Sequence, residues 1–289
     1  MTLLSISGQT RIVGIFGDPI AHTRSPAMQN AAFRALQLPF VYVPFLVRPP
    51  ELSRAVQSIR TLNLAGVNVT VPHKERVVRH LDRLSEEAQQ CGAVNTIVNH
   101  AGILLGDNTD GRGFIQSLKE RNISPQQGPV IMIGAGGSAR AVLVSLIQAG
   151  YSHISIVNRT IKNAQTLVRA YRQLSHAHMD ALPLEALRDP TLLKEATLII
   201  NCTPLGLYGE KFPTLAYKET PQNCVFYDLL YRPDLTSFLQ GAQRSRRPIL
   251  DGRRMLLHQG ALAFLLWTNT SAPLSVMARA LNQSLKQQG

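Results

Sequence analysis

A glycine-rich turn between an apolar strand and a helix constrains the fold of this chain most. Residues 130–133 read Val-Ile-Met-Ile, which is typical of a buried strand, and the turn after them opens a helix expected over 139–149. Glycine permits a tight turn and a close approach of a pyrophosphate, which the N–H groups of a helix N-terminus bind. The alternative is a tight connection without a ligand, since the third small position is alanine rather than glycine. The predicted dinucleotide-binding residues are Gly134, Ala135, Gly136, Gly137, Ser138 and Ala139.

Short apolar runs alternate with helical patterns along most of the chain. The expected strands are residues 11–16, 41–45, 67–69, 130–133, 154–157, 198–200 and 225–227, and the expected helices are 26–36, 51–61, 139–149, 162–173, 255–267 and 274–286. This alternation predicts parallel sheets with helices on both faces, which is an α/β fold. We expect two domains with a cleft between them. An N-terminal α/β substrate domain comprises residues 1–111 plus 252–289, with the C-terminal helices packing back, and a Rossmann-like, doubly wound dinucleotide-binding domain comprises 112–251.

Charge and cysteine content narrow the class of protein. The net charge is +12, but the dense basic cluster at 244–247, with Arg253 and Arg254, has no interleaved aromatic residues. We therefore interpret it as solvated surface and expect no nucleic-acid partner. Three scattered cysteines without metal-ligand spacing, no signal-peptide pattern and no long apolar stretch predict a cytoplasmic protein without a metal site or a membrane partner. The expected assembly is a monomer or a homodimer.

The end of the second strand in the middle segment indicates which dinucleotide is bound. Residues 154–157 are followed by Asn158, Arg159 and Thr160, where NAD enzymes often carry an acidic residue for the ribose hydroxyls. Arg159 can pair with a 2′-phosphate, and its two neighbours can donate hydrogen bonds to phosphate oxygens. These residues favour NADP. The alternatives are NAD, or an arginine that only caps a solvated strand end.

Polar loops follow the apolar strands of the first segment, where open α/β sheets place ligands. They lie at residues 17–26, 66–74, 92–96 and 107–111, and the second of them is expected to lead into a helix. Each loop taken alone is more typical of turn chemistry. Together, their hydroxyl and amide groups suit a substrate with several hydroxyls, and Lys74 with Asp110 forms a set able to transfer a proton.

The order and spacing of these motifs resemble the shikimate dehydrogenase family from about residue 11 to 270. The matching stretches are 17–30, 68–74, 92–96, 108–111, 134–140, 158–160, 201–206, 227–231, 251–252 and 255–260. The resemblance implies an NAD(P)-dependent oxidoreductase that interconverts shikimate and 3-dehydroshikimate, or a related cyclic polyol acid such as quinate, by hydride transfer. An NAD-preferring quinate/shikimate dehydrogenase and a non-catalytic relative that senses cofactor and ligand are the alternatives.

The resemblance also assigns roles to single residues. Lys74 would be the catalytic lysine and Asp110 its acidic partner. The residues expected to bind the substrate are Thr23 and Ser25 at its carboxylate, Asn68, Thr70, Asn95 and Gln259 at the ring hydroxyls, and Tyr231 near the carboxylate. Asn158, Arg159 and Thr160 would meet the adenosine side of the cofactor. Thr203 is a further cofactor residue, and those expected at the nicotinamide are Leu229, Gly252 and Met255.

Several positions depart from the family's usual pattern. Thr23 replaces a serine, and Asn163, beside Lys162, stands where strongly NADP-dependent members often carry a second arginine. Arg253 and Arg254 replace smaller residues near the expected nicotinamide site. The departures suggest a paralogous branch. His73 precedes the catalytic lysine and could tune it, contact the substrate or lie on the surface; we favour the surface.

Overall fold

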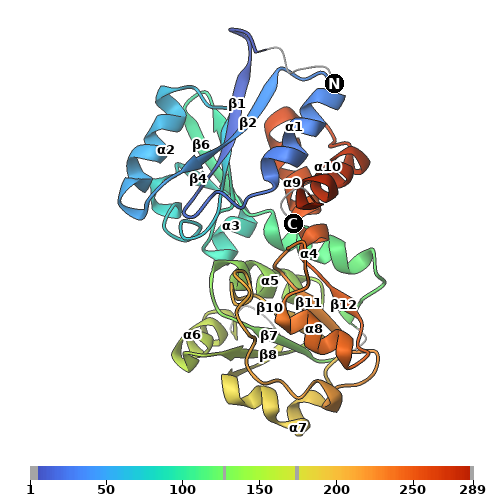
Figure 1. The fold of residues 1–289 in the computed structure, drawn as a ribbon. Coiled ribbons are helices and arrows are strands. Elements are labelled where there is room, and N and C mark those ends of the chain that lie inside the picture. Colours follow the sequence, from blue (N-terminus) through green and yellow to red (C-terminus); the bar gives the residue numbers. More distant parts are fainter. Residues whose placement is uncertain (1–5, 126–127, 173–175, 287–289) are drawn as a thin grey trace. The chain divides into compact units, whose positions relative to one another are not determined.

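The computed structural model describes residues 6–125, 128–172 and 176–286 (Figure 1). The chain divides into two compact units, Met1–Gly113 with Leu256–Gly289, and Phe114–Met255. The substrate-binding and cofactor-binding roles that the sequence assigns to its two domains stay predictions, and each unit is described by itself.

The first unit contains a sheet of strand order β2-β1-β3-β5-β6-β4. Its strands are β1 (Arg11–Gly17), β2 (Phe40–Leu46), β3 (Gly66–Val69), β4 (Arg83–Leu84), β5 (Thr96–His100) and β6 (Ile103–Asp107). β1 is parallel to β2 and β3, whereas β5 is antiparallel to both β3 and β6. β4 is parallel to β6, so the expected parallel arrangement is wrong for this unit only at β5, which is antiparallel to both of its neighbours. Ala101 and Gly102, with φ of 51° and 90°, close a two-residue hairpin between β5 and β6.

Helices cover this sheet and link the two units. The first unit holds α1 (Ser25–Ala35), α2 (Leu52–Thr61), α3 (Glu86–Cys91), α10 (Leu274–Lys286) and the 3-10 turns η1 (Pro49–Glu51) and η2 (Val78–His80). The chain passes between units within α4 (Asp110–Lys119) and α9 (Arg253–Thr268). In Figure 1, α10 (red) lies beside α1 (blue), where the Arg24 guanidinium donates to the carbonyl of Ser284 at 3.0 Å. α2 buries Val56 and Ile59 in a core with Val67 and Ile97 of the sheet.

The second unit contains a parallel sheet of order β12-β11-β10-β7-β8-β9. Its strands are β7 (Val130–Ile133), β8 (His153–Asn158), β9 (His178–Pro183), β10 (Leu198–Asn201), β11 (Val225–Asp228) and β12 (Ile249–Leu250). Its helices are α5 (Gly137–Gln148), α6 (Ile161–Arg172), α7 (Pro190–Leu193) and α8 (Ser237–Arg244), with 3-10 turns η4 (Leu184–Arg188) and η5 (Tyr217–Glu219). Read from β9, this is the 3-2-1-4-5-6 order of dinucleotide-binding folds, with the strand order reversing between β7 and β10. The predicted α/β class with a Rossmann-like domain is confirmed.

Candidate active site

A lysine–aspartate pair forms the centre of the polar site in the first unit. Lys74 Nζ lies 2.5 Å from Asp110 Oδ2, and the two side chains are only 14% and 7% exposed. Asp110 begins α4, and its Oδ1 accepts a hydrogen bond from Asn95 Nδ2 at 2.7 Å. The carboxylate is thus held from both of its oxygens, and this arrangement fixes the ammonium group that it faces. The structure brings together the two residues that the sequence expects to exchange a proton.

The turn that carries Lys74 differs from the sequence expectation. Residues 70–77 form turns rather than the start of a helix, and only the short η2 follows. The turn is closed by backbone hydrogen bonds, from His73 N to the Thr70 carbonyl and from Val94 N to the Lys74 carbonyl. The lysine is therefore placed by backbone contacts to the loop before β5.

His73 is buried, so the surface interpretation of this residue is wrong. Its side chain is 0% exposed, and its Nε2 lies 2.6 Å from the Val47 carbonyl, just beyond the end of β2. Because a carbonyl can only accept, this contact assigns the proton to Nε2. Nδ1 has no hydrogen-bond partner in the described structure. The imidazole braces the turn that carries Lys74 against the end of a neighbouring strand.

Asn95 connects the acidic partner to the C-terminal part of the unit. Its Nδ2 also donates to Thr109 Oγ1 at 3.0 Å, and its Oδ1 accepts from the backbone N of Thr109 at 2.9 Å. The Thr109 hydroxyl in turn donates to the Gln259 carbonyl at 3.1 Å. A Cβ on Gly113 would lie 2.7 Å from the Gln259 backbone N, so only glycine permits α4 and α9 to approach this closely. The structure therefore gathers Asn95, Asp110 and Gln259 around one point.

Asn68 depends on a tyrosine that the sequence interpretation did not select. The Tyr42 hydroxyl donates to Asn68 Oδ1 at 2.8 Å, and Asn68 Nδ2 donates to the Asn95 carbonyl at 3.1 Å and to Thr96 Oγ1 at 3.0 Å. Tyr42 is 1% exposed and alternates with outward residues along β2. In the sequence, Tyr42 stands in a strand pattern, which favours a role in the core. Its partner Asn68 lies 26 residues away, so the sequence pattern does not connect the two.

The remaining substrate candidates of this unit lie on the loops after β1 and β3. Ser25 is buried at the first residue of α1, and its backbone N is 3.4 Å from Thr23 Oγ1. A Cβ on Gly17 would lie 2.4 Å from the Thr70 methyl, so these two loops are in contact. Tyr231 belongs to the second unit, and its expected approach to the substrate carboxylate stays a prediction.

The glycine turn of the second unit has the shape that a dinucleotide requires. Gly134 has a φ of +114°, and a Cβ there would lie 3.0 Å from the Thr203 methyl. Thr203, another predicted cofactor residue, therefore packs on the turn. A Cβ on Gly136 would meet nothing within 4 Å. The helix α5 begins at Gly137 without a side-chain cap, and the amides of a helix N-terminus are suited to bind an anion. The turn therefore leaves room at Gly136, next to a helix N-terminus, where a phosphate group would fit.

The other cofactor candidates lie at the carboxyl ends of neighbouring strands. Asn158 ends β8 and donates from Nδ2 to the Thr160 carbonyl at 2.9 Å, which orders a turn with Arg159 exposed on it. A Cβ on Gly252 would lie 2.1 Å from the Leu229 carbonyl, so these two predicted nicotinamide residues are in contact. Met255 is 7% exposed at the start of α9.

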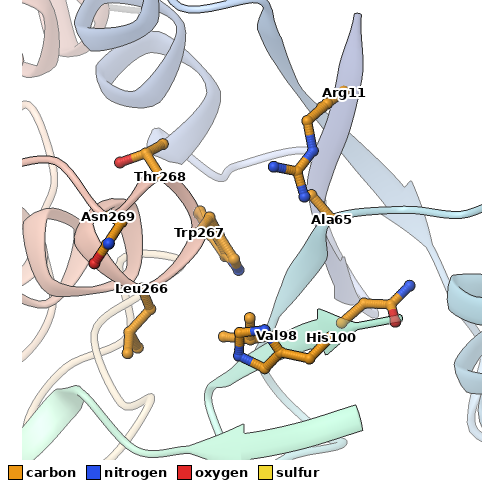
Figure 2. Close-up of a pocket in the computed structure, with 9 residues that line it drawn as sticks. Arg11, Ala65, Val98, His100, Leu266, Trp267, Thr268 and Asn269 are labelled. Atoms are coloured by element: carbon orange, nitrogen blue, oxygen red, sulfur yellow. The ribbon is translucent and has the colours of Figure 1, made fainter. Parts of the chain in front are cut away.

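A pocket of about 390 Å³ in the first unit lies away from these residues (Figure 2). Arg11 opens β1 and Ala65 precedes β3, whereas Asn68 and Thr70 lie toward the other end of β3. Figure 2 shows Trp267 and Thr268, from the end of α9, among the lining side chains. The pocket is therefore at the opposite end of the sheet from the Lys74–Asp110 pair.

Two further properties concern only the residues that the structure describes. Within 6–125, 128–172 and 176–286, no three His, Cys, Asp or Glu side chains are grouped as metal ligands would be. Among the helices of the same ranges, none combines the length and the apolar character needed to cross a membrane.

Together, the fold and the lysine–aspartate site define a dinucleotide-dependent α/β oxidoreductase. Family models match the chain as "Shikimate dehydrogenase substrate binding domain" at residues 15–97, "Shikimate / quinate 5-dehydrogenase" at 117–208 and "Shikimate 5'-dehydrogenase C-terminal domain" at 252–281. The shikimate dehydrogenase (NADP(+)) of Desulforamulus reducens is 44% identical over 97% of each chain. The chain belongs to the shikimate dehydrogenase family. The predicted family and the predicted class of oxidoreductase are confirmed.

The chain is also similar to solved structures of shikimate and quinate dehydrogenases. The chain is similar to shikimate 5-dehydrogenase from Thermus thermophilus in complex with NADP(H) and shikimate, with a TM-score of 0.84, 36% identity and coverage of 96% of this chain and 100% of that one. It is also similar to quinate dehydrogenase from Corynebacterium glutamicum in complex with NAD, with a TM-score of 0.86, 27% identity and coverage of 95% and 99%.

Proposed function

We propose that this chain interconverts shikimate and 3-dehydroshikimate with NADP as the hydride carrier. The observation that carries the proposal is the Lys74–Asp110 pair, held at 2.5 Å in a chain 44% identical to a shikimate dehydrogenase (NADP(+)). A protein that only sensed its ligands would need no pair able to transfer a proton. The pair therefore favours catalysis over the sensing alternative.

Lys74 transfers the proton of the reaction, and Asp110 holds Lys74 in position. In the reducing direction the ketone carbon gains a hydride, which the bound dinucleotide supplies, and the oxygen gains a proton. The Lys74 ammonium donates that proton, and in the oxidising direction the neutral amine removes it from the alcohol. Asp110 keeps Nζ in place through Oδ2 while Asn95 holds Oδ1, so the lysine can return to one position after each turnover.

The polar residues around the pair suit a hydroxylated ring acid. Asn68 uses both amide hydrogens inside the protein. Among the residues that the structure describes, its Oδ1 accepts from Tyr42 alone, which leaves a lone pair for a ring hydroxyl. Asn95 must exchange one of its present hydrogen bonds for a substrate hydroxyl. The residues assigned to the substrate are Thr23, Ser25, Asn68, Thr70, Asn95, Gln259 and, from the second unit, Tyr231.

The second unit supplies residues that fit NADP. The open space at Gly136 and the uncapped start of α5 suit the pyrophosphate. Arg159 is exposed at the end of β8, where a guanidinium can pair with a 2′-phosphate, and this supports NADP over NAD. Leu229, Gly252 and Met255 would hold the nicotinamide end of the cofactor, and Thr203, which packs on the glycine turn, would be a further cofactor residue.

We further propose a cytoplasmic location and a monomer or a homodimer. Three free cysteines, two of them buried, suit a reducing compartment. Nucleic acid is not among the proposed partners, because one arginine of the basic cluster 244–247 has an internal role. Arg247 donates to the Thr220 hydroxyl at 3.1 Å and to the Lys218 carbonyl at 3.1 Å.

The direct test is the absorbance of the reduced nicotinamide with purified protein, crossing shikimate and quinate with NADP and NAD. We expect the highest kcat/KM for shikimate with NADP. A higher value for quinate with NAD would establish the runner-up function, which the quinate dehydrogenase neighbour supports. No turnover in any combination, with NADPH still bound, would instead support the sensing alternative.

A further inference from the structure

A buried carboxylate outside the proposed proton-transfer pair lies at the carboxyl end of the second sheet. Asp228 ends β11 and is 0% exposed, and its register partner on β10 is Asn201. In the described chain its partners are neutral donors: Asn201 Nδ2 at 3.0 Å and Leu230 N at 3.1 Å to Oδ1, and Thr236 Oγ1 at 2.6 Å to Oδ2. Burying a carboxylate without a cation is costly, so this group requires an explanation.

Each partner of Asp228 orders a segment that holds a predicted cofactor residue or starts a helix. The Asn201 side-chain oxygen accepts from Thr203 N and Oγ1, and the Asn201 carbonyl accepts from Leu229 N. The Leu230 carbonyl accepts from Gly252 N at 2.9 Å. Thr203, Leu229 and Gly252 are therefore each one hydrogen bond away from a direct partner of Asp228 or from the segment that contains it.

We propose that Asp228 is a positioning residue whose carboxylate fixes the loops that bind the nicotinamide end of the cofactor. The inference rests on the proposed function, because only that function assigns these loops to a cofactor. A carboxylate suits the role because it is acceptor-only and can satisfy three converging donors at once. An apolar residue would leave all three donors unpaired, and the loops would separate to hydrate them.

The electrostatic surroundings support this assignment. Burial raises the pKa of Asp228 to about 6, and the nearby Asp251 carboxylate acts in the same direction. Among the described residues, the Asp228 carboxylate in turn raises the pKa values of Cys202 and Tyr217, and neither of these groups is a cation. An ionised carboxylate at this place is therefore unfavourable for stability, and the three donors that it holds together are the geometric role that we assign to it.

The test measures NADPH binding by titration calorimetry, without substrate, for Asp228→Ala and Asp228→Asn in the full chain. Asparagine keeps an acceptor for Asn201 and Leu230 and can donate to the Thr236 hydroxyl, which rotates to accept. We expect the alanine variant to bind NADPH about 10–100-fold more weakly, as expected for a misplaced site, and the asparagine variant to restore the affinity to within about threefold. Thr220→Ala is the matched control, since Thr220 is buried near the other end of β11 and should leave the affinity unchanged.

The melting temperature of each variant is measured first. Only variants that melt well above the temperature of the binding assay are compared, so that all of the protein is folded. If folded Asp228→Ala binds NADPH as tightly as the native chain, or if asparagine fails to restore what alanine loses, the inference is overturned. Native protein that binds NADPH but does not turn over shikimate would overturn the proposed function alone. A rise in the KM for NADP with an unchanged KM for shikimate would further separate a positioning role from a general loss of structure.

Discussion

Replacing Asp228 with asparagine should change how the stability of the chain depends on pH. Asparagine has nearly the same shape but cannot ionise, so the variant isolates the free energy of ionising a buried carboxyl. Asp228 has a pKa of about 6 in the folded chain, against an ordinary value of 3.8, because burial disfavours its charged form. Each pH unit between the two values corresponds to about 1.4 kcal/mol, so the whole effect is about 3 kcal/mol.

The sign follows from proton binding. The folded chain holds the Asp228 proton more tightly than the unfolded chain, so this group favours folding below about pH 4, and its contribution is lost as the pH rises through about 6. The native chain should therefore lose stability relative to Asp228→Asn as the pH rises. About half of the effect, roughly 1.4 kcal/mol, should fall between pH 5 and pH 8.

Urea unfolding of both proteins at pH 5, 6, 7 and 8 provides the assay. Effects of all other groups cancel in the difference between the two free energies of unfolding. Asp82→Asn is the control, because a hydrogen bond from the Leu104 backbone lowers the pKa of Asp82, which is ionised in both states over this range. Its difference should stay constant. A constant difference for Asp228→Asn as well would refute the argument that burial raises this pKa.

Three further substitutions test the substrate and cofactor assignments. Tyr42→Phe removes the donor to Asn68 Oδ1 and should lower the free energy of unfolding by about 1–2 kcal/mol. The kcat/KM for shikimate should fall while the Kd for NADPH is unchanged. Equal losses in shikimate turnover and NADPH binding would count against the assignment of Asn68 to the substrate. Arg159→Gln should raise the KM for NADP about tenfold and leave that for NAD unchanged, because only NADP offers a phosphate to pair with the guanidinium; a parallel rise would show a structural role. Thr23→Ser should change the ratio of kcat/KM for shikimate and quinate, and an unaltered ratio would remove Thr23 from the specificity determinants.

The central strands of the fold were predictable because their environment is uniform. All four residues of β7 are buried, so an apolar run alone indicated the strand. The hairpin β5–β6 was not found, because its polar ends at Asn95, Asp107 and Asn108 were interpreted as loops. The helix expected after β3 was also wrong, since backbone contacts to Val94 hold that segment in turns.

The site was predictable to the extent that its residues stand in short motifs. Lys74 and Asp110 were expected together, and the structure places them in contact. The supporting residues were not found, because each acts through a partner that is distant in the sequence. Tyr42 looks like any inward residue of a strand, and His73 is buried only because its turn folds against Val47. Such contacts are tertiary, so local pattern does not reveal them.

The central claim is that Lys74 donates the proton to the substrate oxygen in the reducing direction and removes it in the oxidising direction. Lys74→Met keeps an unbranched side chain, one heavy atom shorter than that of lysine, and removes the ammonium group. We predict that its kcat with shikimate and NADP falls by about 10²–10⁴, as for the loss of a general acid–base group, while its Kd for NADPH stays within about twofold of the native value. Turnover within tenfold of the native enzyme would contradict the account.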